Sequence, residues 1–281
     1  MKIVSWNMAH KRESWRYLAN MDVDLALLQE TCKPPSDVAA RIETDPAPWY
    51  SGARGRWRTA IAKLSDRVRV EWLEPGPIAN TPFGEFAVST PGTLTAARIW
   101  APSGEPFVAV SMCAEWESPD ATAGGRWIYA DASVHRIVSD LCAFIGRQRG
   151  HRILAAGDLN ILRGYGEGGS KYWAARYRTV FERFRAIGLP CIGPESPNGR
   201  QADPWPNELP KDSTTVPTFH SNRQSPATAS RQLDFVFASE GFADRLTVHA
   251  LNAPEKWGPS DHCRVGIELK DTVASGTRTG A

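Results

Sequence analysis

The chain has 281 residues, of which 42% are hydrophobic, and its formal net charge is +2. These values predict a globular protein with a sizeable core, and the charge is too small to identify a nucleic-acid-binding protein by itself. No stretch reaches the roughly twenty apolar residues of a membrane-spanning helix, and five cysteines without paired spacing argue against a disulfide framework and a structural zinc site. Because residues 2–6 resemble a strand rather than a signal peptide, we expect a cytoplasmic, monomeric protein.

Ten short runs rich in Val, Ile, Leu and Phe predict strands, and four stretches with apolar residues three and four positions apart predict helices. The strands are too many for one flat sheet, and the helices do not alternate strictly with them. This pattern favours an α+β sandwich of two packed sheets flanked by helices. We expect residues 1–270 to form one domain and 271–281 a flexible tail. In chain order the predicted elements are strand 2–6, helix 12–21, strand 25–28, helix 36–43, strands 59–64, 68–72, 93–100 and 107–112, helix 127–149, strand 152–156, helix 173–187, and strands 233–238, 246–251 and 263–269.

Two long connections interrupt these elements. Residues 163–172 contain four glycines, and residues 194–217 contain six prolines. Long ordered loops in a compact domain are either functional or simple surface insertions. Both loops are therefore candidates for substrate selection, and the sequence leaves the two readings open.

Polar side chains stand where several predicted strands end or begin. The strand 152–156 runs into Asp158 and Asn160, two residues apart and therefore on the same face of an extended chain. An aspartate can bind a hard cation or polarise a water, and an asparagine can donate to an anionic oxygen, so the pair indicates metal-assisted attack on phosphate. The alternative is an Asx turn that closes a core strand. Glu30 follows another apolar strand and suits Mg²⁺ or Mn²⁺, although a salt-bridged glutamate at a strand end would explain it too.

Five such motifs occur along nearly the whole chain: Trp6-Asn7, Leu28-Gln29-Glu30, Gly157-Asp158-Leu159-Asn160, Leu233-Asp234-Phe235 and Ser260-Asp261-His262. In this order they resemble the endonuclease/exonuclease/phosphatase superfamily, which includes deoxyribonuclease I-like and exonuclease III-like enzymes. The resemblance implies a four-layer sandwich and an Mg²⁺ or Mn²⁺ cofactor.

The same resemblance implies a role for each matched residue. Glu30 would be the main metal ligand, with Asn7 and Asp261 beside it. Asp158 would orient or deprotonate the attacking water, and Asn160 would hold a phosphate oxygen. His262, oriented by Asp234, would contact the scissile phosphate or shuttle a proton.

The chain departs from the family pattern at two positions. Some relatives carry an acidic residue two positions after the first-strand asparagine, where this chain has Ala9, and this favours a single metal ion. Relatives also place a His or Tyr at the end of the central strand, where this chain has Cys113. Four residues that follow in sequence could contact the phosphate instead: Glu115, Trp116, Arg126 and Tyr129. Positions on a strand edge and on a helix face would explain the same residues equally well.

Two clusters of basic and aromatic residues are candidates for substrate binding. Arg54, Arg56 and Arg58 alternate with Gly55 and Trp57, so an extended chain would place the three guanidinium groups on one face for a phosphate backbone, with Trp57 as a stacking plane. A charged edge strand is the alternative. The second cluster comprises Tyr165, Tyr172, Trp173, Arg176 and Arg178.

The sequence therefore predicts a metal-dependent phosphoric ester hydrolase. The favoured substrate is DNA or RNA, because the basic and aromatic clusters suit nucleic acid. The alternatives are a phosphatase or phosphodiesterase on small esters, such as a phospholipid headgroup, inositol phosphate or nucleotide, and a binding module that has lost activity.

Overall fold

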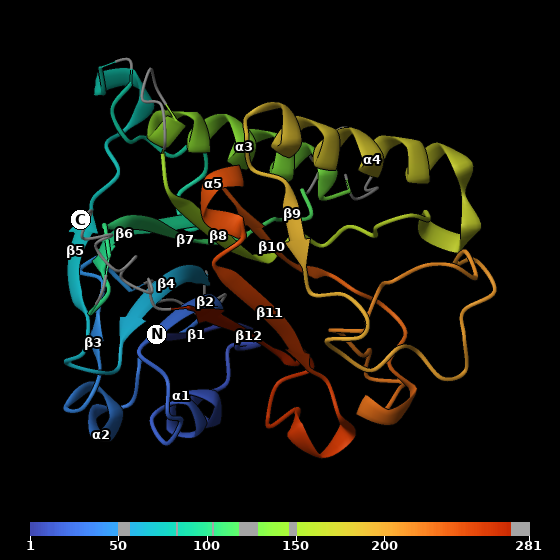
Figure 1. Ribbon diagram of the computed structural model, residues 1–281. Coiled ribbons are helices and arrows are strands. Elements are labelled where there is room, and N and C mark those ends of the chain that lie inside the picture. The colour runs from blue at the N-terminus through green and yellow to red at the C-terminus, as the bar shows by residue number, and fades with distance from the viewer. Residues whose placement is uncertain (50–56, 83, 103, 118–128, 146–150, 271–281) are drawn as a thin grey trace, which may run out of the picture.

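Figure 1 shows the computed structural model, which describes residues 1–49, 57–82, 84–102, 104–117, 129–145 and 151–270. Within these ranges twelve strands form two mixed six-stranded sheets. The first sheet has the order β11-β12-β1-β2-β4-β3 and the second the order β5-β6-β7-β8-β10-β9. The strands are β1 (Lys2–Asn7), β2 (Leu25–Thr31), β3 (Glu43–Thr44), β4 (Arg58–Lys63), β5 (Arg69–Leu73), β6 (Leu94–Trp100), β7 (Phe107–Cys113), β8 (Ile153–Asp158), β9 (Cys191–Gly193), β10 (Asp234–Ala238), β11 (Leu246–Leu251) and β12 (Arg264–Leu269).

The sheets pack face to face, with helices on both outer faces, so the chain has four layers (Figure 1). Alternating residues of one strand serve two cores: Ile3 lies between the sheets, whereas Val4 packs outward against the Trp15 side of the first helix. This burial on both faces explains why the strands read as continuous apolar runs. The helices are α1 (Arg12–Leu18), α2 (Ser36–Ala39), α3 (Asp131–Ile145), α4 (Lys171–Ala186) and α5 (Glu240–Ala243).

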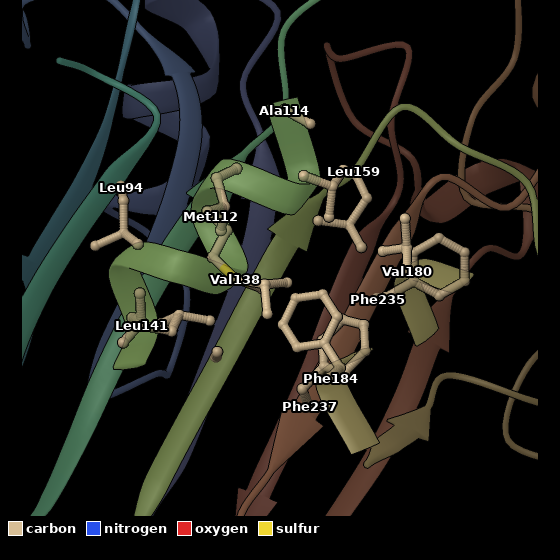
Figure 2. Close-up of a cluster of buried hydrophobic side chains, with 14 of the residues drawn as sticks. Leu94, Met112, Ala114, Val138, Leu141, Leu159, Val180, Phe184, Phe235 and Phe237 are labelled. Carbon is tan, nitrogen blue, oxygen red and sulfur yellow. The ribbon is translucent and has the colours of Figure 1, made fainter. Parts of the chain in front are cut away.

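Helices α3 and α4 cover the outer face of the second sheet (Figure 2). Along α3 the buried apolar residues recur three and four positions apart, the spacing that aligns them on one helical face. From α4, Phe184 stacks on Phe237 of β10 with ring centroids 3.8 Å apart. This packing fixes α4 over the strands that carry the polar residues described below.

Strand direction brings the polar strand ends together. β1 and β2 are parallel, and so are β7 and β8, so within each pair the carboxyl ends lie at the same edge. β10 runs antiparallel to β8, so its first residue, Asp234, lies opposite Asp158. On the other side of β8, Cys113 is the partner of Asp158. Strand contacts between the two sheets join these edges into one site.

The ten predicted strands are confirmed, with their ends shifted by at most three residues. The two-residue β3, the three-residue β9 and the four-residue α5 were missed, because they are too short to show a period. The helix predicted at 36–43 ends at Ala39, and the one predicted at 127–149 is described from Asp131 to Ile145. The predicted tail at 271–281 lies outside the described residues. Among the helices that the structure describes, none combines the length and apolar character needed to span a membrane.

Candidate active site

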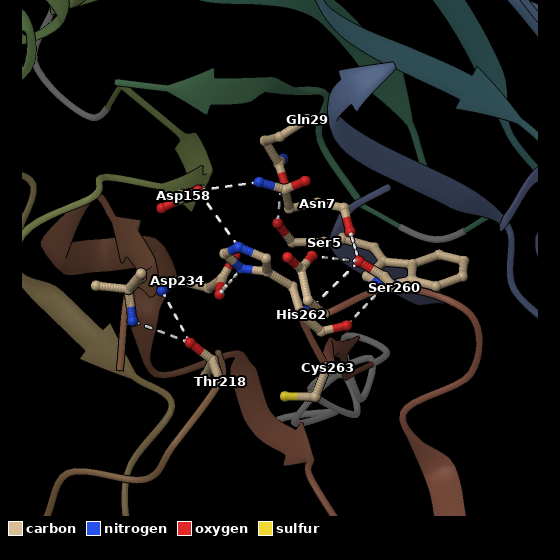
Figure 3. A network of polar contacts seen from close by, with 12 residues as sticks. Ser5, Asn7, Gln29, Asp158, Thr218, Asp234, Ser260, His262 and Cys263 are labelled. Atoms are coloured by element: carbon tan, nitrogen blue, oxygen red, sulfur yellow. Dashed lines mark hydrogen bonds and ion pairs between the residues drawn. The ribbon is translucent and has the colours of Figure 1, made fainter. Parts of the chain in front are cut away.

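Asp158, the last residue of β8, is fully buried and accepts hydrogen bonds on both carboxylate oxygens. Figure 3 shows the contact with Asn7. Asn7 Nδ2 donates to Oδ2 over 2.9 Å. The Asn160 backbone N–H donates to Oδ1 over 2.8 Å, and Asn160 Nδ2 lies 3.2 Å from Oδ2. The residue is therefore held in one orientation by groups from both sheets.

Asn160 adopts a left-handed backbone conformation, with φ of 52°. Its amide also donates to the carbonyl of Ala114 over 3.0 Å, which ties the segment after β8 to the segment after β7. Close approach of these strands depends on Gly157, because a Cβ atom built there would lie 1.8 Å from the Met112 carbonyl oxygen. Glycine is thus required one residue before Asp158.

His262 lies between two carboxylates in Figure 3. Its Nδ1 is 2.8 Å from Asp234 Oδ2, and its Nε2 is 3.7 Å from Asp158 Oδ2. The backbone is fixed as well: the His262 N–H donates to Ser260 Oγ over 3.1 Å, and the His262 carbonyl accepts from Trp6 Nε1 over 3.0 Å. The ring is therefore held with Nδ1 toward Asp234 and Nε2 toward Asp158.

Burial and charge set the protonation of this cluster. Burial favours the neutral ring of His262, but attraction to Asp234 and Asp158 outweighs it and raises its pKa to about 10. Burial raises the pKa of Asp158 to about 7; the charge of His262 opposes this shift, and the charges of Asp234 and Glu30 add to it. Near neutral pH the site can therefore pair a protonated imidazole with a carboxyl group that is able to take up or release a proton.

Glu30 completes the site from β2, with a left-handed φ of 47°. His10 Nε2 lies 3.2 Å from its Oε2. Burial acts to raise the pKa of Glu30, but the hydrogen bonds from His10 and Asn7 and the charge of His262 lower it overall, so Glu30 is a carboxylate at neutral pH. The contact with His10 was not predicted, because nothing in the sequence around His10 separates it from a surface histidine.

One group of potential metal ligands is found in the described part of the chain: Glu30, Cys113 and Asp158, with one ligand atom from each within 4.8 Å of the others. Burial raises the pKa of the Cys113 thiol well above its usual range, so Cys113 remains a thiol. The remaining donors are carboxylate oxygens, with the Asn7 side chain beside them, and this set fits Mg²⁺ or Mn²⁺ better than a soft metal. Asp261 lies outside this group, next to Ser260 and His262.

A hollow of about 330 Å³ adjoins the site on the Phe219 side. The Phe219 ring packs on His262 with centroids 5.0 Å apart, and Leu162, Tyr165 and Arg231 also line the hollow. Burial raises the pKa of Tyr165 to about 12, so its hydroxyl stays protonated. The hollow offers an apolar wall and hydrogen-bonding groups beside His262.

No protein-family model and no curated protein matches the chain. Solved structures do match, at low identity. The catalytic domain of Xenopus laevis APE2 is 16% identical with a TM-score of 0.64, covering 96% of this chain and 92% of its own. The 3'-5' exonuclease NExo from Neisseria meningitidis is 19% identical with a TM-score of 0.58, covering 96% and 100%. An endonuclease/exonuclease/phosphatase from Bacteroides vulgatus is 13% identical with a TM-score of 0.55, covering 96% and 98%. The chain has the endonuclease/exonuclease/phosphatase fold.

Within this fold, six of the seven predicted catalytic and metal residues are joined by direct contacts or by the ligand group: Asn7, Glu30, Asp158, Asn160, Asp234 and His262. The seventh, Asp261, is adjacent to His262 in sequence and contributes to the charge around its ring. The roles assigned to all seven stay predictions. Cys113 is the last residue of β7, and it is buried beside Asp158.

Arg58, which we predicted to contact substrate, is buried inside the fold. Its side chain is 3% exposed and pairs with Asp45 at 2.7 Å, and its guanidinium stacks 3.7 Å from the centroid of the Trp49 ring. β4 is an inner strand between β2 and β3, so the segment after β3 covers Arg58. Trp57 is half-buried next to it, and Arg54, Arg56 and Arg126 lie outside the described residues.

Proposed function

We propose that this chain is a divalent-metal-dependent phosphodiesterase that hydrolyses nucleic acid by in-line attack of water on phosphorus. The observation that carries this proposal is the 3.7 Å separation between Asp158 Oδ2 and His262 Nε2, each held by its own hydrogen bonds. A buried carboxylate beside a protonated imidazole provides a base for water and a cation for a phosphate oxygen.

The protonation states of Asp158 and His262 assign them different roles in the reaction. Asp158 accepts the proton of the attacking water, for which a pKa near 7 is well suited. His262 carries its positive charge toward the phosphate from Nε2, while Asp234 keeps Nδ1 protonated. The amide of Asn160 is placed to donate to a phosphoryl oxygen once substrate displaces part of its present bonding. Glu30, with Asn7 and Asp158 nearby, would hold the cation, which supplies charge neutralisation at the phosphoryl and leaving oxygens when bound.

Support for nucleic acid as substrate comes from two sources. The similar structures include a protein described as a 3'-5' exonuclease. In this chain, the exposed ring of Tyr172, the half-buried ring of Trp173 and several arginines follow the strand that carries Asp158. Both fit a substrate with bases and a phosphate backbone better than a lone phosphate group.

The test is incubation of the purified chain with Mg²⁺ or Mn²⁺ and three substrates: plasmid, a single-stranded oligonucleotide, and a panel of small phosphate esters. We expect cleavage of nucleic acid that chelation with EDTA abolishes and that Asp158→Asn reduces about 10²- to 10⁴-fold. Asp66→Asn is the matched control, because Asp66 is a fully exposed aspartate whose loss should leave the rate unchanged. Cleavage of small esters alone would refute nucleic acid as substrate, and undiminished activity of Asp158→Asn would refute the assigned site.

A further inference from the structure

Four aromatic side chains, Trp116, Tyr129, Tyr172 and Trp173, form a continuous ring surface. The ring centroids of Trp116 and Tyr129 are 4.9 Å apart, those of Tyr129 and Trp173 are 4.1 Å apart, and those of Tyr172 and Trp173 are 5.1 Å apart. Tyr172 and Trp173 belong to the first turn of α4, whereas Trp116 belongs to the segment after β7. Elements distant in sequence therefore contribute to one surface.

The ring surface begins beside the candidate active site. The Ala114 N–H donates to the Asp158 carbonyl over 2.9 Å, and the Ala114 carbonyl accepts from Asn160 Nδ2 over 3.0 Å. Trp116 is two residues further along, which corresponds to at most about 7 Å of backbone. A strand whose phosphate lies at Asp158 would reach the Trp116 ring with its next one or two nucleotides.

The two ends of the ring surface are open to solvent. Trp116 is 40% exposed and Tyr172 is 61% exposed, and they are two of only three large hydrophobic side chains that are at least 40% exposed among the described residues. The backbone beneath Trp116 is nevertheless anchored. The Glu115 N–H donates to Ser133 Oγ over 3.0 Å, and Glu117 pairs with Arg136 of α3. On α4, Arg176 pairs with Asp131 at 2.8 Å. Exposed rings on a fixed backbone are typical of stacking sites rather than of core packing.

Cationic side chains on α4 suit a phosphate backbone. A groove of about 500 Å³ runs along α4 and is lined by Arg163, Lys171, Arg178 and Arg185. Lys171, Arg178 and Arg185 are seven residues apart, so they share one helical face. The helix that carries Tyr172 and Trp173 therefore also carries cations that could contact phosphates.

We propose that the ring surface stacks unpaired bases of the strand that is cleaved, so that the protein binds single-stranded or frayed nucleic acid in preference to an intact duplex. Stacking on a side chain requires a base with a free face, and bases inside a duplex have both faces covered by neighbouring bases. The proposal rests on the proposed nuclease function, and it assigns specificity to Trp116 and Tyr172, not catalysis.

The experiment compares binding and chemistry in the same variants. Affinity for a fluorescent single-stranded 12-mer and for the matching duplex is measured by anisotropy, and the rate is measured on bis(4-nitrophenyl) phosphate, which carries no neighbouring nucleotides. We expect Trp116→Ala and Tyr172→Ala each to weaken single-strand binding about fivefold or more. Duplex binding and the small-ester rate should change less than about twofold. Trp116→Phe should recover most of the affinity, because the ring face is kept.

Trp100→Ala is the matched control. Trp100 is a partly buried tryptophan whose ring is covered by Arg69. It lies at one end of β6, whereas the other end of β6 pairs with Met112, next to Cys113. Trp100→Ala should alter none of the three measurements. Unchanged single-strand affinity in Trp116→Ala and Tyr172→Ala, or equal losses for single strand and duplex, would overturn the proposal. If neither the oligonucleotide nor the small ester is hydrolysed with Mg²⁺ or Mn²⁺, the proposed function fails, and the anisotropy result still decides the stacking proposal separately.

Discussion

Replacing Asp234 by asparagine should change how the stability of the metal-free protein depends on pH. In the folded chain the pKa of His262 is about 10, whereas an unfolded histidine titrates near 6.5. The folded state therefore holds a proton that the unfolded state has released. The stabilisation of the folded state by the proton on His262 is complete below pH 6.5 and is lost as the pH rises through 10. One proton corresponds to about 1.4 kcal/mol per pH unit, so between pH 7.5 and 9 the free energy of unfolding should fall by about 2 kcal/mol.

In Asp234→Asn the side chain 2.8 Å from His262 Nδ1 loses its charge but keeps its size. The pKa of His262 should therefore fall, and the free energy of unfolding should depend less steeply on pH. The assay is urea unfolding of both proteins at several pH values in EDTA, because a bound cation would change these pKa values. The comparison stops at pH 9, because the buried thiols of Cys113 and Cys263 also have raised pKa values. Above that pH they lower the free energy of unfolding of both proteins. Equal slopes in the two proteins would refute the assignment of this proton to His262 and Asp234.

Three further changes test the site and its support. Glu30→Gln should remove most of the rise in unfolding temperature that Mg²⁺ or Mn²⁺ gives the native chain, because it removes a carboxylate from the ligand group; a full rise in the variant, measured by calorimetry, would place the metal elsewhere. Gly157→Ala should destabilise the fold by about 3 kcal/mol or more, since the new Cβ would overlap the Met112 carbonyl; unchanged urea unfolding would contradict this. Asp45→Asn should destabilise the chain by about 3–5 kcal/mol by leaving Arg58 buried without its carboxylate, and a loss below 1 kcal/mol would show that other partners compensate.

The sequence was sufficient to predict the layers of the fold and the meeting of the polar strand ends. The strands are long, apolar and buried on both faces, so their composition alone distinguishes them. Within each sheet, parallel neighbours bring carboxyl ends to the same edge, which places Asn7 beside Gln29 and Cys113 beside Asp158. The contact between Asn7 and Asp158 also depends on how the two sheets pack. Short elements such as β9 have no such signal, because three residues cannot show a period.

The substrate-contacting surface was predicted less well, because alternation along a strand fixes a face but not what covers that face. Arg58 illustrates the limit: its side chain is covered by Asp45 and Trp49, which come from a segment whose path no local pattern predicts. Trp173 was predicted from its place in the basic and aromatic cluster that follows the Asp158 strand. Its ring contact with Tyr129, from a different part of the chain, could not be predicted from that local pattern.

Backbone strain gives an independent reason to locate function at this edge. Four non-glycine residues in the described part of the chain have positive φ, and they are Ala9, His10, Glu30 and Asn160. Such conformations cost about 1–3 kcal/mol each and persist only where the surroundings impose them. His10 contacts Glu30, Ala9 donates to Asn7, and Asn160 donates to Asp158, so all four border the same carboxylates. Packing alone would not concentrate strain at one strand edge, whereas positioning Glu30 and Asn160 for a ligand would.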